Sequence, residues 1–233
     1  MRLDKFVSSQ LNISRKDART AILRGRVTVC GTVIKTADLK IDENTDAVAF
    51  DGQALSYKEH IYIVMNKPRG VLSASEDKRQ PTVIDLIPEN LRRNGLFPVG
   101  RLDKDTTGLL IITDDGDFAH RVLSPKKEIF KTYIAELDGE ITPDMPEKFL
   151  NGVILADGTR CRKALLKPIG KNITEIRICE GKYHQIKRMF GTVGLGVNAL
   201  ERTAVGNFRL PEKLPVGACS ETDLETLGSI FSD

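Results

Sequence analysis

A polar turn that runs directly into an apolar segment is the feature that most constrains how this chain folds. Residues 100–108 are rich in charged and hydroxyl side chains, and residues 109–112 read Leu-Leu-Ile-Ile. Consecutive aliphatic residues after a glycine-containing turn predict a buried strand. Asp103 lies in the turn between the cations Arg101 and Lys104. Because functional groups concentrate in loops at the edge of rigid strands, Asp103 is the first candidate for chemistry.

Two other interpretations of Asp103 are an ordinary turn aspartate and a calcium ligand. Residues 103–108 together with Asp114 match the ligand spacing of a calcium loop. Such a loop needs helices on both sides and a bidentate Glu at its last position, whereas a strand follows this turn. Arg101 and Lys104 would also repel a divalent cation. We therefore expect no metal site at this turn.

The distribution of charge indicates an anionic partner. The chain has 233 residues, 40% of them hydrophobic, and a net charge of only +3. Residues 1–35 contain eight Lys or Arg and two Asp, which makes this segment +6 and the remainder −3. A basic terminal module on a slightly acidic body is typical of nucleic-acid binding, although a solvated charged helix is the simpler alternative.

The cysteines and the chain start favour a cytoplasmic protein. Cys30, Cys161, Cys179 and Cys219 are scattered, without a CxxC pair or a nearby His at ligand spacing. Neither a disulfide framework nor a zinc site is expected. The first residues are charged and lack the long apolar core of a secretory signal, and no segment is apolar enough to cross a membrane.

Residues 1–35 are expected to form two helices followed by a hairpin. Apolar residues recur at helical spacing from Leu3 to Leu11. Ser14 is a suitable N-cap for a second helix that ends near Gly25. Strands at 27–29 and 32–34 would then pair through a tight turn.

The rest of the chain is dominated by strands. Residues 51–60 are polar and are interpreted as a linker. Strands are expected at 61–65, 71–72, 109–113, 132–137, 164–167 and 173–178, and short helices at 83–86, 117–123 and 144–150. This order predicts an α+β fold with a mixed, mainly antiparallel sheet.

Three motifs resemble those of the pseudouridine synthases, within them the branch of ribosomal small subunit pseudouridine synthase A. The first is Gly-Arg-Leu-Asp at 100–103, and the second is Lys-Thr-Tyr at 131–133. The third is Gly-Lys-Tyr-His-Gln-Ile-Lys-Arg-Met at 181–189, on a helix whose apolar stripe includes Ile186 and Met189. The resemblance covers nearly the whole chain.

The resemblance implies a role for each candidate residue. Asp103 is the catalytic carboxylate. Tyr133 stacks on the target base, and Lys187 pairs with Asp103. Leu200 packs near that base, and Arg101 helps to extrude the base or hold its phosphate. Each side chain also has a purely structural interpretation, because a strand Tyr or an apolar Leu is ordinarily part of a core.

The implied reaction breaks the glycosidic C–N bond of a uridine, rotates the uracil and rejoins it through a C–C bond. It uses no metal and no organic or nucleotide cofactor. A carboxylate can stabilise or capture an oxocarbenium-like sugar, or act as a base. Attack at the anomeric carbon, attack on the uracil ring and a glycal route all remain open.

The N-terminal segment resembles the αL-type RNA-binding domain of a small-subunit ribosomal protein. The family usually has Asn or Asp where this chain has Cys30, which leaves the turn type of the hairpin open. The cations expected to contact RNA lie in both parts of the chain: Arg2, Lys5, Arg15, Lys16, Arg19, Arg24, Lys67, Arg69 and Arg188.

The sequence therefore predicts an RNA-binding domain at 1–59 and a catalytic domain at 60–233. We expect a monomeric enzyme that isomerises a uridine in 16S ribosomal RNA. Its partner would be ribosomal RNA or a ribosomal-subunit assembly intermediate, and we expect no membrane partner. The alternatives are a synthase acting on 23S ribosomal RNA and a non-catalytic RNA-binding or ribosome-assembly factor with the same fold.

Overall fold

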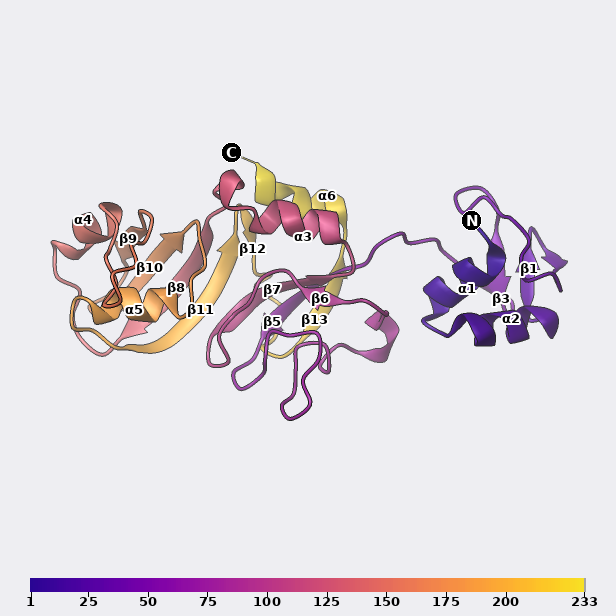
Figure 1. Cartoon of the computed structure of the whole chain (residues 1–233), viewed down its shortest axis with the longest axis horizontal. Coiled ribbons are helices and arrows are strands. Elements are labelled where there is room, and N and C mark those ends of the chain that lie inside the picture. Colours follow the sequence, from indigo (N-terminus) through magenta and orange to yellow (C-terminus); the bar gives the residue numbers. More distant parts are fainter. Residues whose placement is uncertain (233) are drawn as a thin grey trace. The chain divides into compact units, whose positions relative to one another are not determined.

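The chain folds as two compact units, and the computed structural model describes residues 1–232. The first unit comprises Met1–Ile61 together with Arg92–Gly95. The second comprises Tyr62–Leu91 and the chain from Leu96 onward. Figure 1 follows the chain by colour through both units. The short segment Arg92–Gly95 belongs to the first unit, which no feature of the sequence indicates.

Two helices and a small sheet make up the first unit (Figure 1). Helix α1 (Leu3–Leu11) ends at Asn12, which adopts a left-handed conformation with φ +54°. Ser14 caps α2 (Arg15–Leu23), and its Oγ accepts a hydrogen bond from the backbone N–H of Asp17 at 3.1 Å. This cap confirms the predicted helix start. The core contains Leu3, Phe6, Val7, Ala18, Ile22, Val27, Ala37, Ile41 and Val48.

The sheet of the first unit is antiparallel and has the strand order β2-β1-β3-β4. Its strands are β1 (Val27–Val29), β2 (Thr32–Val33), β3 (Val48–Phe50) and β4 (Gln53–Leu55). Cys30 and Gly31 join β1 to β2 with φ of +48° and +78°. Positive φ at both central residues is the pattern of a type I′ hairpin, so Cys30 adopts the conformation for which Asn or Asp is preferred.

The expected linker at 51–60 is partly wrong. Asp51 and Gly52 form a second turn with positive φ at both residues, and β4 follows directly. Leu55 and Tyr57 pack against the core of the first unit, and the Tyr57 ring stacks on Phe6 with a centroid distance of 5.9 Å. The polar residues next to these apolar positions face solvent. The sequence of this segment therefore resembles that of a linker, although part of it forms a strand.

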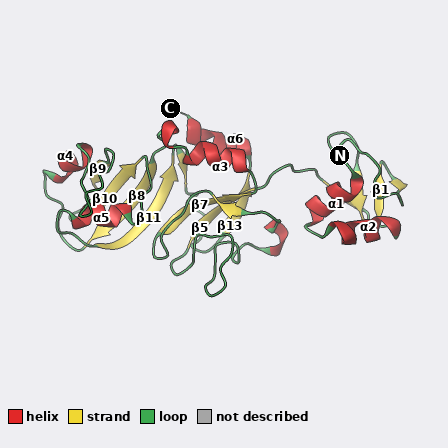
Figure 2. Cartoon of the chain, viewed as in Figure 1, coloured by secondary structure: helices red, strands yellow, loops and turns green. Residues whose placement is uncertain are grey.

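A nine-stranded mixed sheet forms the second unit (Figure 2). Its main path runs β13-β5-β7-β11-β8-β10-β9, with β12 paired to β11 and β6 paired to β7. Among the described pairs, only β7 with β11 is parallel. The strands are β5 (Tyr62–Lys67), β6 (Phe97–Pro98), β7 (Thr107–Thr113), β8 (Lys131–Leu137), β9 (Leu165–Pro168), β10 (Ile173–Ile178), β11 (Val197–Val205), β12 (Phe208–Arg209) and β13 (Cys219–Thr222). The α+β class with a mainly antiparallel sheet is thus confirmed.

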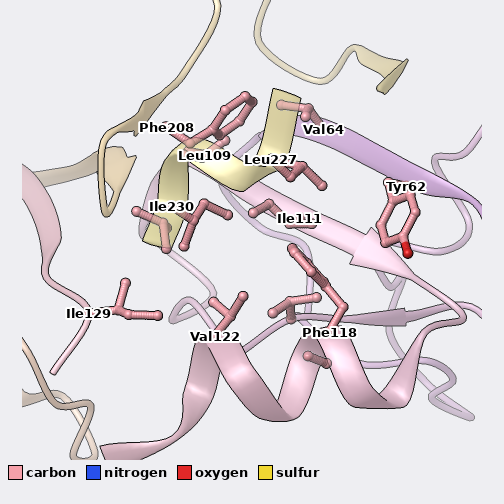
Figure 3. Close-up of a cluster of buried hydrophobic side chains, with 13 residues drawn as sticks. Tyr62, Val64, Leu109, Ile111, Phe118, Val122, Ile129, Phe208, Leu227 and Ile230 are labelled. Carbon is pink, nitrogen blue, oxygen red and sulfur yellow. The ribbon is translucent and has the colours of Figure 1, made fainter. Parts of the chain in front are cut away.

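Two helices cover one face of the β5–β7 half of this sheet (Figures 1 and 3). They are α3 (Gly116–Leu123) and α6 (Leu224–Leu227), the latter continued by the 3-10 helix η3 (Gly228–Phe231). Phe118 of α3 packs edge to face on Tyr62 of β5, with ring centroids 5.3 Å apart. Ile111 and Leu227 complete the same buried cluster. Burial of these side chains fixes β7, and so the loop that precedes it.

Helices α4 (Met145–Leu150) and α5 (Gln185–Gly191) accompany the β8–β10 half of the sheet. Phe149 of α4 and Phe190 of α5 are fully buried with ring centroids 5.0 Å apart. Two further 3-10 turns are η1 (Glu89–Leu91) and η2 (Pro125–Lys127). None of the helices described in residues 1–232 is long and apolar enough to cross a membrane.

Three expected elements differ from the structure. The strand at 71–72 is reduced to a single bridge between Leu72 and Thr82. The helix at 83–86 is a turn, in which the Asp85 carboxylate accepts from the backbone N–H of Thr82 at 2.7 Å. The long strand β11 was not predicted. Its residues Ala199 to Arg202 have good helix propensity, and only the sheet around them makes them extended.

Candidate active site

Asp103 lies in the loop between β6 and β7, where it lines a cavity of about 500 Å³. The same cavity is lined by Arg101, Tyr133, Lys187 and Leu200. These five side chains come from the loop before β7 and from β8, α5 and β11. The structure therefore brings together every residue that the sequence motifs assigned to the substrate pocket, while their individual roles stay predictions.

Lys67, the last residue of β5, holds the Asp103 loop through its main chain. Its side chain is fully buried. Its Nζ lies within 3.3 Å of main-chain carbonyl oxygens, which belong to Pro68, Asp103, Lys104 and Thr106. Burial lowers the pKa of Lys67 to about 8, against the opposing effect of the nearby Asp carboxylates. The prediction that Lys67 contacts RNA is wrong, because its buried ammonium group cannot reach a phosphate.

Lys187 lies between two carboxylates rather than beside Asp103 alone. Its Nζ is 2.6 Å from both carboxylate oxygens of Asp105 and 3.9 Å from Oδ2 of Asp103. The expected pairing with Asp103 is therefore the longer of two contacts. The hydrogen bond from Lys187 lowers the pKa of Asp105.

His184 lies beside the other carboxylate oxygen of Asp103. Its Nε2 is 3.7 Å from Oδ1 of Asp103, and 28% of the Asp103 side chain remains exposed. Asp103 is thus a partly accessible carboxylate with a cationic or hydrogen-bonding group beside each oxygen. The Asp103 carboxylate can therefore act on a sugar or base that enters the cavity.

Tyr133 and Leu200 form the apolar wall of the cavity. Tyr133 of β8 pairs with Arg202 of β11, and Leu200 pairs with Ala135. Residues two apart on one strand share a face, so Tyr133 and Leu200 are diagonal neighbours on the same side of the sheet. Both side chains are buried except for the atoms that reach the cavity. An aromatic ring and an aliphatic side chain together suit a flat, mostly apolar ligand.

The turn that precedes α5 forms the opposite rim. Lys182, Tyr183 and His184 all line the cavity. Gln185 is buried, and its side-chain amide donates to Oε1 of Glu180 at 2.8 Å while its carbonyl accepts from the backbone N–H of Lys182 at 2.9 Å. The burial of Glu180 would raise its pKa, but hydrogen bonds from Lys182 and Arg162 outweigh burial and lower it. An ionised, fully bonded carboxylate thus fixes the shape of this rim.

Comparison with known proteins decides the family. Residues 61–192 match the family described as RNA pseudouridylate synthase. A protein of Bacillus subtilis named as an RNA pseudouridine synthase is 41% identical over 231 residues, with 97% of each chain covered. The chain belongs to the RNA pseudouridylate synthase family. It is thereby an isomerase that makes pseudouridine in RNA, and the catalytic class expected from its motifs is confirmed.

Other relatives of this pseudouridine synthase agree in both length and fold. Ribosomal small subunit pseudouridine synthase A of Escherichia coli is 38% identical over 232 residues, covering 99% of this chain and all of that protein. A crystal structure of a pseudouridylate synthase superposes with a TM-score of 0.69 at 31% identity, covering 99% of both chains. Residues 1–46 match the S4 domain, which confirms the RNA-binding type expected at the N-terminus.

The predicted RNA-contacting cations of the synthase's S4 domain are all exposed: Arg2, Lys5, Arg15, Lys16, Arg19 and Arg24. Four of them, Arg2, Arg15, Lys16 and Arg19, line one shallow surface depression. Asp4 is buried beside it and accepts hydrogen bonds from Arg2 and Arg15, each at 2.9 Å. Their contact with RNA stays a prediction.

The two remaining cations of the synthase have protein partners. Arg69 is exposed, and its guanidinium donates to the carbonyl oxygen of Asn198 at 2.9 Å. Arg188 forms an ion pair with Asp157 and donates to the carbonyl oxygen of Tyr183 at 3.3 Å. Arg188 is therefore neutralised by Asp157 and stabilises the cavity rim through its hydrogen bond to Tyr183. Within residues 1–232, no group of three or more His, Cys, Asp or Glu side chains is placed to hold a metal ion.

Sequence reasoning missed His184 and Asp105 as parts of the site. It placed His184 within the helical motif at 181–189 and assigned it no role. In the structure His184 precedes α5 with a left-handed φ of +46°, which turns it toward Asp103. Sequence reasoning assigned no role to Asp105, although Lys187 lies closer to Asp105 than to Asp103. The signal for His184 was its position at the start of the helix within a long motif.

Proposed function

We propose that this enzyme isomerises a specific uridine to pseudouridine in ribosomal RNA, and in the 16S RNA in particular, with Asp103 as the catalytic carboxylate. The observation that carries the proposal is the position of Asp103 in the cavity, between the Lys187 ammonium group and the His184 ring and beside the Tyr133–Leu200 wall. The full-length similarity to a relative named as a ribosomal small subunit synthase supports the choice of RNA.

The arrangement fits each step of the isomerisation. A target base that leaves its stack needs an aromatic face and an enclosed pocket, which Tyr133 and the cavity of about 500 Å³ supply. Asp103 supplies a carboxylate that can stabilise or capture an oxocarbenium-like ribose when the C–N bond breaks, which is one of the open routes. The Lys187 ammonium group lies 3.9 Å from that carboxylate and helps to orient it. The S4 domain would bind the RNA that flanks the target uridine.

The test is a map of pseudouridines in 16S and 23S ribosomal RNA from cells with and without this protein. One uridine of the 16S RNA should lose its modification in cells without the protein and regain it with the parent chain. A missing site in 23S RNA instead would move the substrate to the large subunit. No missing site in either ribosomal RNA would overturn the proposed substrate and would place the target uridine in another RNA.

Asp103→Asn tests the catalytic assignment, because it keeps size and removes charge. Single-turnover conversion should fall by about 10⁴-fold, the scale seen when one member of a catalytic unit is removed, while RNA binding persists. Asp105→Asn is the matched control in the same turn and should stay within about tenfold of the parent, since Lys187 remains beside Asp103. If Asp105→Asn loses activity and Asp103→Asn does not, the catalytic carboxylate is Asp105.

A further inference from the structure

Tyr183 exposes a large aromatic ring at the rim of the active-site cavity. Its exposed fraction is 76%, and no other described side chain among the exposed large hydrophobic residues is aromatic or as exposed. It lines the cavity together with His184 and Lys182. A tyrosine ring at the rim of a cavity can bury its apolar face against a ligand while its hydroxyl stays in water.

The exposure of Tyr183 is fixed by its surroundings and does not come from a loose loop. The backbone N–H of Gln185 donates to the carbonyl oxygen of Lys182 at 3.2 Å, and the Gln185 side chain closes the same turn. Arg188 donates to the carbonyl oxygen of Tyr183 at 3.3 Å and is itself paired with Asp157. The main chain on both sides of Tyr183 is therefore held in place.

His184 supports one face of the Tyr183 ring. The two rings are stacked, with centroids 3.9 Å apart and an angle of 18° between their planes. This stack requires a left-handed backbone at His184, with φ +46°, a conformation that a non-glycine residue adopts at some cost. The same histidine lies 3.7 Å from Asp103, so the ring pair extends from the carboxylate to the open rim. The other face of Tyr183 is left exposed.

We propose that this outer face of Tyr183 binds the base of a nucleotide next to the target uridine by stacking. The proposal rests on the proposed function, because it assigns a subsite for the same RNA. A uridine that enters the cavity leaves its neighbour without a stacking partner, and a fixed aromatic ring at the rim replaces that partner. Every base has a π-face, so this subsite holds RNA without reading its sequence.

Fluorescence offers a direct test, because the chain contains no tryptophan. Tyr183→Trp keeps an aromatic ring and adds a single reporter. Its emission should be quenched, and should saturate, when protein-free 16S or 23S ribosomal RNA from cells lacking this protein is added. Val216→Trp places the reporter at a site that is 67% exposed in the same unit but outside the cavity, and it should show little change. Equal responses from both reporters would overturn the proposal.

Kinetics separate stacking from a merely structural role. Tyr183→Ala should raise KM by about 5- to 150-fold, the range expected when one base–aromatic stack is removed, with kcat nearly unchanged. Tyr183→Phe should restore the parental KM, because it keeps the π-face and removes only the hydroxyl. A fall in kcat without a change in KM would instead mean that Tyr183 acts only by supporting His184, and an unchanged KM and kcat would remove it from the site.

The two proposals can fail independently. If the parent chain forms no pseudouridine in either ribosomal RNA, the proposed function fails, yet the fluorescence comparison still reports whether RNA stacks on residue 183. If the parent is active but Tyr183→Trp is not quenched by the RNA that it modifies, the stacking subsite fails and the proposed function stands.

Discussion

A single buried ammonium group, that of Lys67, connects the end of β5 to the loop that carries Asp103. Its contacts are all to main-chain oxygens, so they fix the path of the loop without depending on which side chains the loop presents. The Asp103 and Lys104 carbonyls also accept from the backbone N–H groups of Thr106 at 3.1 Å and Gly70 at 2.8 Å, so Lys67 adds a second donor to each and ties the loop to the end of β5. Lys67 is therefore a positioning residue for the site, on the protein side of the cavity and away from RNA.

Replacing Lys67 with Met should destabilise the second unit by about 1 to 3 kcal/mol, the cost of a buried carbonyl group that loses a hydrogen-bond donor. Hydrogen exchange on β5 and β7 of the full chain would measure the loss. Lys104→Met is the control, since Lys104 is exposed and bonds only the Gln80 side chain among the described contacts of its own ammonium group. Unchanged protection with weakened RNA binding would contradict this role.

Among the elements, the parallel pair β7–β11 depends on a close approach at Gly108. Its φ is +96°, and a Cβ at this position would lie 2.3 Å from the carbonyl oxygen of Arg202. Glycine alone avoids both the strained backbone and the overlap. This contact joins the strand that follows the Asp103 loop to the strand that carries Leu200, so it sets the distance across the cavity.

Gly108→Ala should lower the free energy of unfolding of the second unit by about 3 kcal/mol or more, through backbone strain and overpacking together. Thermal unfolding of the full chain, followed by hydrogen exchange on β7 and β11, would show it. Gly116→Ala at the start of α3 is the matched control, since a Cβ there meets nothing within 4 Å. If Gly108→Ala leaves the free energy of unfolding unchanged, β7 and β11 can move apart to accommodate the added methyl group.

The buried Asp4 carboxylate of α1 accepts a hydrogen bond from Arg15 of α2. The stability of these two helices should therefore depend on whether Asp4 is ionised. Burial would raise the pKa of Asp4, but hydrogen bonds from Arg2 and Arg15 outweigh burial and hold it below the usual 3.8. A lowered folded-state pKa gives stability that is present above pH 3.8 and is lost as the pH falls through the folded-state value.

Hydrogen-exchange protection of α1 should therefore decrease in this acidic range, after correction for the intrinsic exchange rate. Asp4→Asn should have lower protection at neutral pH and a flatter decrease with acid, because its amide cannot titrate. Asp38→Asn, at an exposed site of the same unit, should follow the parent. If Asp4→Asn and the parent lose protection in parallel, another group controls the acid response.

Across the whole molecule, the cationic depression of the S4 domain and the catalytic cavity are on separate units. The first unit contains the depression lined by Arg2, Arg15, Lys16 and Arg19, and every residue that lines the catalytic cavity belongs to the second. Affinity for RNA and turnover should therefore be separable by mutation. Arg15 is a poor choice for charge reversal, because a Glu there would face the buried Asp4.

Lys16→Glu combined with Arg19→Glu should weaken RNA binding, because two cations near the RNA backbone become anions. The log–log salt slope should decrease by about 0.7 for each phosphate of single-stranded RNA that the variant no longer neutralises. The single-turnover rate at saturating RNA should not change. Lys35→Glu with Lys40→Glu is the control, with the same charge change at exposed positions outside the depression. Equal losses of affinity in both double variants would show that only net charge matters.

The amino-acid sequence by itself determined the features that depend on neighbours along the chain. The Ser14 cap, the apolar strand at 109–112 and the helix after residue 184 follow from local chemistry and short periodicity. The resemblance also identified five residues that line the cavity, namely Arg101, Asp103, Tyr133, Lys187 and Leu200, because a reaction constrains residue types at fixed spacings. Fold class and family were accessible for the same reason.

Only the tertiary structure decided the features that depend on partners distant in sequence. Strand β11 lies in the middle of the sheet although its residues favour helix locally, since pairing with β7 and β8 overrides propensity. Lys67 is buried because other chain segments cover it and supply its acceptors. Lys187 lies 2.6 Å from Asp105 and 3.9 Å from Asp103, and which carboxylate it contacts depends on how α5 packs beside the loop before β7.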